Sequence, residues 1–358
     1  MIKFIHSGDI HLGLRFSNVS FGGEKGKTRR LELWQSFRRF ISYGIENKVD
    51  LILLTGDIFE KDLVTLSDVK RLRDILASAK DQKVFIIAGN HDNLGKDSLY
   101  NKVKFSDNVY IFNSENIHSV ELKELNLKVS GISWDNYSGD ALNKIDDIVI
   151  DKMQKNILLI HGDIYGDSKY MTIDLKTLKS LNFDYIALGH IHKPEIISDN
   201  IAYCGSLEPL DFGELGERGF ILGEIESDTN IEFVPFSSRR FKIHEIHVEN
   251  YHSYEYIFNK IMEISSEGKD KDLYRIILIG NMSLDIDKDL LTQDLLQEFY
   301  HLEMHFNTSN IDIDDIKAKN KDNVIGKYIE SFTQEEREDP IYSKALEIGI
   351  KTLLEGGK

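Results

Sequence analysis

Five short, nearly continuous runs of apolar residues stand out along the first half of the chain. They span residues 2–5, 51–54, 84–88, 157–160 and 185–188. Runs of this length with almost no polar side chain are typical of strands that are covered on both faces. The pattern therefore predicts a parallel or mixed sheet with helices packed on it.

Helical periodicity appears between the first strands. Leu33, Trp34, Phe37, Phe40 and Ile41 recur at spacings near 3.6, and residues 69–79 form a second amphipathic helix. Residues 14–30 are expected to form a loop, and weaker strands are expected over 108–113 and 127–134. Alternation of strand and helix favours an α/β fold.

The second half of the chain has a different pattern. Strands are predicted over 239–248, 273–281 and 302–307, with helices over 253–265 and 287–300, which makes a small α+β domain. Apolar residues at helical spacing follow within 324–354. We therefore expect three parts: residues 1–226, 235–310 and 320–358. The terminal segment either packs on its own domain or docks on a partner.

Composition narrows the class of protein. The chain has 358 residues, 41% of them hydrophobic, and no apolar run approaches the roughly 18 residues of a membrane span. The N-terminus enters a strand without a signal-peptide pattern. The single cysteine, Cys204, fits a reducing compartment and a buried position. We expect a cytoplasmic protein with no membrane partner.

A net charge of −16 argues against general attraction to phosphate backbones, so a nucleic-acid partner would need a local basic patch. Basic residues that follow the first polar motif are the candidates for such a patch. They are typical of a solvated helix face, with phosphate contact as the alternative. The set comprises Arg15, Lys25, Lys27, Arg29, Arg30, Arg38 and Arg39.

Each of the five apolar runs ends in polar residues of few types. The sequence Gly89-Asn90-His91-Asp92 by itself is explained equally well as a turn after a strand. Five such endings, however, indicate one shared site, because ligands bind at the carboxyl ends of parallel strands. The residues are Asp9 with His11, Asp57, Asn90 with His91, His161, and His190 with His192.

This set of side chains predicts a two-metal site. The imidazoles and the carboxylate pair exceed the needs of one ion, and nitrogen and oxygen ligands without thiolate suit manganese, iron or zinc. Asp57 stands alone at its strand end and is the natural bridging carboxylate. Two ions held in this way activate water and promote displacement at phosphorus, so the implied reaction is phosphoester hydrolysis.

The motifs resemble the signature set of the calcineurin-like metallophosphoesterases. They are Gly8-Asp9-Ile10-His11, Gly56-Asp57, Gly89-Asn90-His91-Asp92, His161 and Gly189-His190-Ile191-His192, in that order. Residues 9–13, 56–59, 203–208, 211–214 and 219–220 resemble the SbcD and YhaO-type DNA repair exonucleases. The resemblance implies a sandwich of two mixed β-sheets flanked by helices, with a smaller α+β capping domain and a C-terminal helical tail.

The resemblance also implies roles for the motif residues. One manganese ion is expected on Asp9, His11, Asp57 and His192, and the other on Asp57, Asn90, His161 and His190. His91 resembles the general acid that protonates the leaving group. Glu60 stands where relatives carry Asp or His, and we expect it to contact His91, with Asp62 as the rival. Asp92 and Asp163 are expected either to orient His161 or the neighbouring loop, or to stabilise turns.

The expected function is metal-dependent DNA exonuclease or endonuclease activity in repair and recombination. By the same resemblance, an SMC-like ATPase, SbcC or YhaN-like, is expected to dock on the C-terminal segment, and the nuclease domain is expected to form a homodimer. Hydrolysis of a small phosphodiester or phosphorylated substrate is the alternative activity. A non-catalytic scaffold for the ATPase is a third alternative, which the intact set of ligand residues disfavours.

Overall fold

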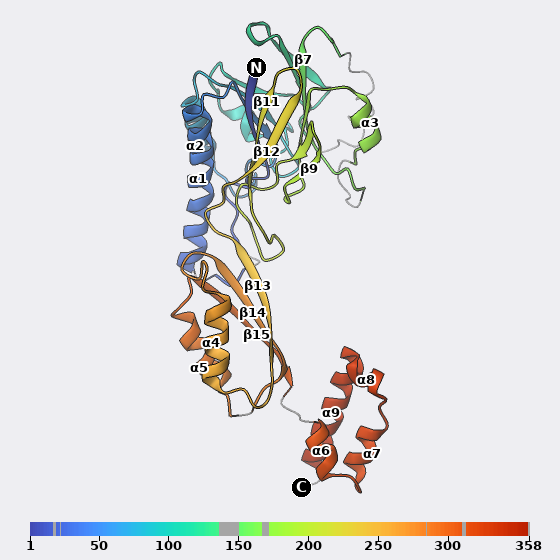
Figure 1. Ribbon diagram of the computed structural model, residues 1–358. Helices are drawn as coiled ribbons and strands as arrows, with labels where there is room; N and C mark the ends of the chain where they lie inside the picture. Colours follow the sequence, from blue (N-terminus) through green and yellow to red (C-terminus); the bar gives the residue numbers. More distant parts are fainter. Residues whose placement is uncertain are drawn as a thin grey trace. The chain divides into compact units, whose positions relative to one another are not determined.

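The computed structural model describes residues 1–16, 19–21, 23–135, 150–166, 172–283, 285–309 and 313–356. The chain forms two compact units, Met1–Phe241 and Lys242–Lys358 (Figure 1). In the described residues, no helix has both the length and the hydrophobicity that a bilayer span needs.

Two six-stranded mixed sheets form the centre of the first unit. The first sheet has the order β12-β11-β1-β2-β3-β4, in which β1 to β4 run parallel and β11 and β12 antiparallel. Its strands are β1 (Ile2–Ser7), β2 (Leu51–Thr55), β3 (Lys83–Ile87), β4 (Val109–Ile111), β11 (Gly219–Ile225) and β12 (Thr229–Pro235).

The second sheet has the order β5-β6-β7-β8-β10-β9, with parallel pairs at its centre and antiparallel pairs at its edges. Its strands are β5 (His118–Leu122), β6 (Leu127–Gly131), β7 (Lys155–His161), β8 (Tyr185–Gly189), β9 (Glu195–Ser198) and β10 (Ile201–Tyr203). The predicted fold class, α/β with two mixed sheets flanked by helices, is confirmed.

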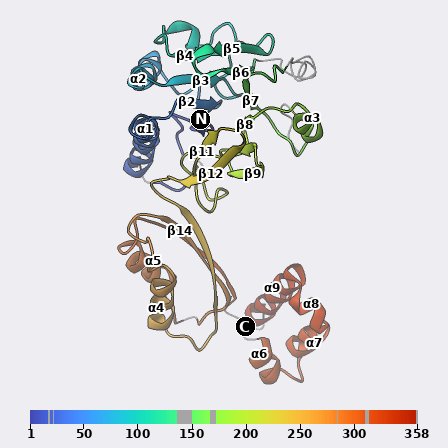
Figure 2. The same cartoon turned by 45° about the horizontal axis from the view of Figure 1, so that its top comes forward.

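Apolar layers explain why the central strands are almost continuously hydrophobic. Phe4, Leu53 and Phe85 point into a core shared with residues of the second sheet, such as Leu159. The opposite face of the first sheet packs on α1 (Gly23–Glu46) and α2 (Leu66–Ala77). The outer face of the second sheet carries α3 (Leu175–Ser180). Figures 1 and 2 show α1 and α2 on one side of the sheets and α3 on the other.

The prediction of a loop over residues 14–30 is wrong for its second part. Helix α1 begins at Gly23, while residues 17, 18 and 22 lie outside the described residues. Arg29 is fully buried, because its guanidinium binds the carboxylates of Glu32 and Glu208. The expectation of a solvated basic face therefore fails at Arg29. The sequence pattern also gave no sign of β11 and β12.

The second unit contains the predicted βαβαβ element. Strands β13 (Phe241–Val248), β14 (Leu273–Asn281) and β15 (His301–Ser309) form one sheet, in which β14 and β15 are parallel. Helices α4 (Tyr254–Ile264) and α5 (Lys288–Leu296) bury Ile257, Ile261, Leu291 and Leu295 against it.

The described residues 313–356 of the same unit contain the helices α6 (Ile313–Lys319), α7 (Val324–Glu330), α8 (Gln334–Glu338) and α9 (Pro340–Gly356). Ile329, Leu346 and Ile350 make a small core between α7 and α9. The predicted amphipathic helix therefore packs part of its apolar face on neighbouring tail helices.

Candidate metal centre

The polar residues that end five strands converge on one region of the first unit. Strands β1, β2 and β3 supply Asp9, His11, Asp57, Asn90 and His91 from the first sheet, and β7 and β8 supply His161, His190 and His192 from the second. Hydrogen bonds join the two groups. The ring of His161 contacts the Thr55 carbonyl oxygen through Nδ1 at 2.8 Å, and the His190 amide donates to the Asp9 carboxylate at 3.1 Å.

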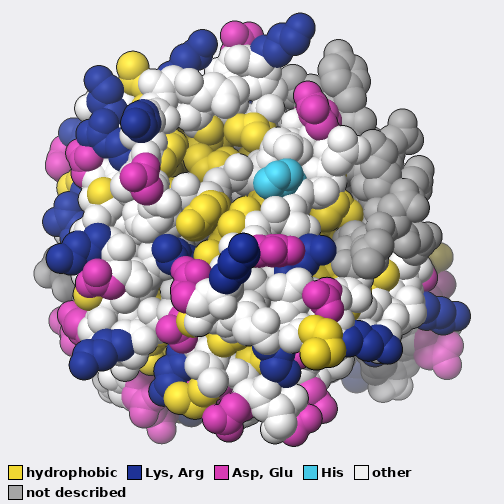
Figure 3. All heavy atoms as spheres, turned by 90° about the horizontal axis from the view of Figure 1, so that it is seen from above, with side chains coloured by type: hydrophobic (Ala, Val, Ile, Leu, Met, Phe, Trp, Pro, Cys, Tyr) yellow, Lys and Arg dark blue, Asp and Glu magenta, His cyan; other side chains and the backbone are white. Residues whose placement is uncertain are grey.

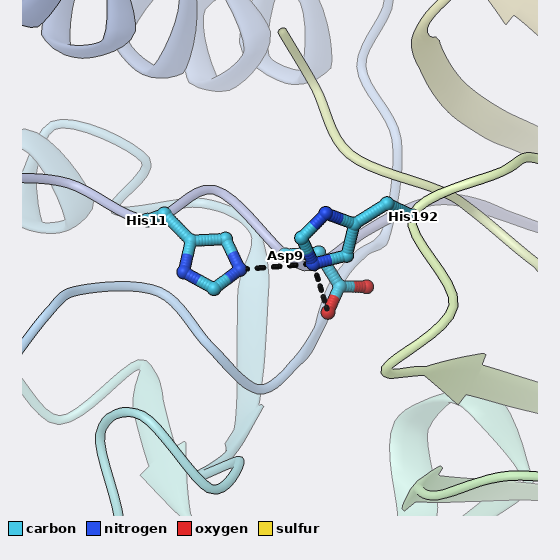
Figure 4. Close-up of side chains that lie close together, drawn as sticks. All are labelled: Asp9, His11 and His192. Atoms are coloured by element: carbon cyan, nitrogen blue, oxygen red, sulfur yellow. Dashed lines mark hydrogen bonds and ion pairs between the residues drawn. The ribbon is translucent and has the colours of Figure 1, made fainter. Parts of the chain in front are cut away.

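Asp9, His11 and His192 form a first cluster. Figure 4 shows the two imidazole rings facing each other, with the Asp9 carboxylate beside the His192 ring. The two Nε2 atoms lie 3.1 Å apart, and His192 Nε2 is 3.9 Å from Asp9 Oδ1. Ring nitrogens this close either share a proton or face a common cation.

Asp57, His161 and His190 form a second cluster, with Asn90 beside it. Asp57 Oδ2 lies 3.4 Å from His161 Nε2 and 3.9 Å from His11 Nε2, so one carboxylate faces both clusters. Asn90 Oδ1 lies 3.0 Å from His161 Nε2. The expectation that Asp57 bridges two metal ions stays a prediction.

The electrostatics of the clusters favour positive charge. Burial alone would lower the pKa of His161, but Asp57 and further neighbours raise this pKa to about 9. Burial also opposes protonation of His192, and Glu214 and Asp9 raise its pKa to about 9. Burial and the neighbouring His161 lower the pKa of His190, which favours the neutral ring that a metal requires.

Asp57 is ionised in this environment. Burial opposes its ionisation, yet His161 and His11 together hold the pKa of Asp57 well below its usual range. Carboxylate oxygens and imidazole nitrogens without thiolate form a donor set that suits manganese, iron or zinc. The residues present therefore fit a pair of divalent transition-metal ions.

The backbone at these residues is strained. Eight non-glycine residues in the described ranges have positive φ, and Asp9, His11, Asp57 and His190 are four of them. Such conformations are costly for residues with a side chain, and they concentrate at functional sites. Close approach adds a second constraint: a Cβ on Gly56 would lie 2.7 Å from the Gly89 amide nitrogen and from His161 Nδ1. The two strand ends meet here because neither residue has a side chain.

Asp92 holds the loops after β2 and β3 together. Its buried carboxylate accepts hydrogen bonds from the amides of Asp57, Ile58 and Gly89, and from the Tyr100 hydroxyl. Burial and the charge of Asp57 raise the pKa of Asp92 to about 6. Asp92 orients the loop that carries Asp57, one of the two roles that the sequence left open.

The expected contact between Glu60 and His91 is present. Glu60 Oε2 lies 2.9 Å from His91 Nδ1, and the His91 amide donates to Asp57 Oδ1 at 2.8 Å. The hydrogen bond to Glu60 raises the pKa of His91. The rival partner, Asp62, is exposed.

Two features of the site were missed by sequence reasoning. Glu214 contacts His192 Nδ1 at 2.5 Å, although its motif was used only for the family resemblance. Glu60 also contacts His11 Nδ1, at 2.6 Å. Long-range pairing between side chains leaves no spacing signal in one sequence, so neither contact was predictable from the pattern.

Three other buried residues, Asp163, His6 and Cys204, lie outside the two clusters. Asp163 is buried, and its side chain accepts a hydrogen bond from the Tyr165 amide. His6 is a buried core residue whose ring contacts Tyr185 and Thr55. Cys204 is buried, as expected.

Known proteins resemble this chain at low identity. YhaO of Bacillus subtilis, which is described as an uncharacterised metallophosphoesterase, is 28% identical to this chain over 250 aligned residues. The alignment covers 65% of this chain and 60% of YhaO. The DNA double-strand break repair protein Mre11 of Archaeoglobus fulgidus is 22% identical over 97% of this chain and 84% of its own length. Mre11 of Methanocaldococcus jannaschii is 26% identical over 89% of this chain and 88% of its own length.

Among solved structures, a dimetal phosphatase from Danio rerio is similar, with 12% sequence identity and a TM-score of 0.40. The alignment covers 66% of this chain and 99% of the phosphatase. A family profile described as calcineurin-like phosphoesterase matches residues 2–194, which include the five strand ends. The family uses a dinuclear metal site, and the clusters described above could bind such ions. The chain therefore belongs to the calcineurin-like phosphoesterase family.

Proposed function

We propose that the chain is a DNA nuclease that hydrolyses phosphodiester bonds with two manganese ions. The observation that carries this proposal is the convergence of two ligand clusters on a single carboxylate, Asp57. A two-ion site of this kind serves in-line displacement at phosphorus.

In the proposed assignment, one ion binds Asp9, His11, Asp57 and His192, and the other binds Asp57, Asn90, His161 and His190. When bound, the ions supply Lewis acidity and lower the pKa of the attacking water. The protein positions the ligands through strained backbone and through hydrogen bonds to the ring Nδ1 atoms of His11, His161 and His192.

His91 is the proposed general acid. Its side chain is 43% exposed, in contrast with the buried ring of His11 beside it. Glu60 occupies Nδ1, which leaves Nε2 to meet the leaving oxygen of the substrate. The hydrogen bond to Glu60 raises the pKa of His91, which favours the protonated ring that a general acid needs.

The choice of DNA rests on the relatives. Two of them are named DNA double-strand break repair proteins, and both align with most of this chain, including the α+β part of the second unit. The proposed capping role of residues 235–310 and the proposed ATPase docking of residues 320–358 rest on the same resemblance, as does a homodimer. Repair and recombination are the proposed processes.

Charge favours a second candidate, hydrolysis of a small phosphodiester or phosphorylated compound. The net charge is −16, and on the face of the molecule in Figure 3 basic and acidic side chains are interspersed. Arg29, one of the basic candidates for a DNA contact, is buried in an ion-pair network. A small substrate would not need an extended basic surface.

The test is degradation of end-labelled linear duplex DNA with added manganese. We expect cutting by the wild-type chain and a loss of at least 1,000-fold in Asp57→Asn, because the amide cannot bridge two cations as a carboxylate does. Folding of the variant is checked by circular dichroism. Hydrolysis of a small phosphodiester without DNA cutting, even with the ATPase supplied, would select the second candidate.

A further inference from the structure

Glu60 lies between two histidine rings that have different proposed roles. Its Oε1 is 2.6 Å from His11 Nδ1, and its Oε2 is 2.9 Å from His91 Nδ1. The two rings are neighbours, with centroids 4.8 Å apart and planes at 82°. One carboxylate therefore serves a proposed metal ligand and the proposed general acid.

The backbone holds Glu60 in this place from both sides. The Glu60 amide donates to the Leu12 carbonyl at 3.0 Å, which ties it to the loop that carries His11. The next amide, that of Lys61, donates to the His91 carbonyl at 3.2 Å. The alignment of three strand-end loops therefore places the backbone of Glu60 between His11 and His91.

The other carboxylate that holds a proposed ligand has a single histidine partner. Glu214 contacts His192 Nδ1 through Oε1, while its Oε2 accepts from the Ser206 hydroxyl and the Leu210 amide. Among the described residues, Glu214 contacts His192 and not His91, so it serves as the matched comparison for Glu60.

A carboxylate at position 60 suits both histidine partners. A histidine that binds a metal through Nε2 carries its proton on Nδ1 and donates it to an orienting acceptor. A carboxylate can accept from two such rings at once, whereas the single oxygen of an amide cannot hold both in this geometry.

We propose that Glu60 is a shared positioning residue, which fixes the ion-facing nitrogen of His11 and the orientation of His91 through one carboxylate. The proposal rests on the proposed function for the role of His91, but the two contacts themselves can be tested without substrate.

The first experiment is NMR of the protein with ¹⁵N-labelled histidine, in its metal-free form. In Glu60→Ala we expect the Nδ1-protonated signals of both His11 and His91 to change, with His192 unchanged. In Glu214→Ala the signal of His192 should change alone. If either alanine variant fails to fold, Glu60→Gln and Glu214→Gln replace the pair, and Glu60→Gln should release at least one of the two rings.

The second experiment is calorimetric titration with Mn²⁺ in the absence of substrate. Both glutamate variants should bind one of the two ions 10- to 100-fold more weakly, and His91→Asn should change neither affinity by more than about threefold. At saturating manganese, Glu214→Ala should regain most of the wild-type kcat, whereas Glu60→Ala should stay at least tenfold slower.

Three outcomes would overturn the shared role. A change at only one ring in Glu60→Ala, wild-type manganese affinity in that variant, or full recovery of its kcat with excess manganese would each assign Glu60 to one histidine. A wild-type chain that binds both ions and hydrolyses no phosphodiester would refute the proposed function instead, while the NMR comparison would still decide the two contacts.

Discussion

His91 carries the clearest pH dependence at the level of single residues. The hydrogen bond that the His91 ring donates to Glu60 raises the pKa of His91 above its ordinary value. A general acid acts while protonated, so kcat/KM should fall as the pH rises through this pKa. Removing the negative charge in Glu60→Gln lowers the pKa, and the alkaline limb of the profile should move to lower pH.

The measurement is kcat/KM against pH at saturating manganese. Asp62→Asn is the matched control, because this carboxylate is only two residues away and is exposed. Asp62→Asn should leave the alkaline limb of the kcat/KM profile at the wild-type pH. An alkaline limb at the same pH in wild type and Glu60→Gln would show that His91 does not donate the proton.

At the level of secondary-structure elements, helix α1 carries a fully buried cation, Arg29, near its start. Arg29 binds Glu32 and Glu208, and Glu32 also binds Arg239 at 2.7 Å. Removing one member of a buried ion network leaves the others uncompensated, at a cost of about 3–5 kcal/mol. Arg29→Met should therefore lower the free energy of unfolding of the first unit by about that amount.

Chemical denaturation followed by circular dichroism measures this change. Arg38→Met, an exposed position on the same helix, should alter the free energy by less than about 0.5 kcal/mol. Equal stabilities for the two variants would mean that the buried network contributes nothing.

Strands and ligands were predictable from the sequence to different degrees. The central strands could be found because burial on both faces leaves an uninterrupted apolar run, and their polar endings contain the residues that we propose as metal ligands. Helix α1 begins earlier than predicted, because Lys25, Lys27 and Arg29 hide its periodicity. Of these three residues only Arg29 is buried, and one of its partners is the distant carboxylate of Glu208. Strands β11 and β12 escaped notice because glycine, glutamate and asparagine interrupt their apolar runs, which are GFILGEI in β11 and TNIEFVP in β12. Glu214 needed tertiary structure to be linked to His192.

At the level of the whole molecule, the C-terminal helices offer an apolar surface. On α9, Ile341 is 79% exposed and Ile348 is 57% exposed, while Leu346 and Ile350 are buried in the tail core. Exposed apolar residues one heptad apart fit the seam of a coiled coil, which is the surface expected of an SMC-like ATPase.

Replacing Ile341 and Ile348 together by Glu should weaken binding to such an ATPase at least tenfold in a pull-down or calorimetric titration, and should leave phosphodiester hydrolysis by the isolated chain unchanged. The control is Leu290→Glu, an exposed apolar position on α5. Equal affinity for wild type and the double variant would place the partner elsewhere.

The left-handed backbone at Asp9, His11, Asp57 and His190 has a consequence for protein engineering. Each such residue costs about 1 to 3 kcal/mol relative to a relaxed conformation, and glycine would relieve that cost. A screen that selects only for heat resistance in a chelating buffer would therefore favour replacements at these four positions. The most thermostable variants recovered in this way would be those that had lost the side chains proposed to bind the metal ions.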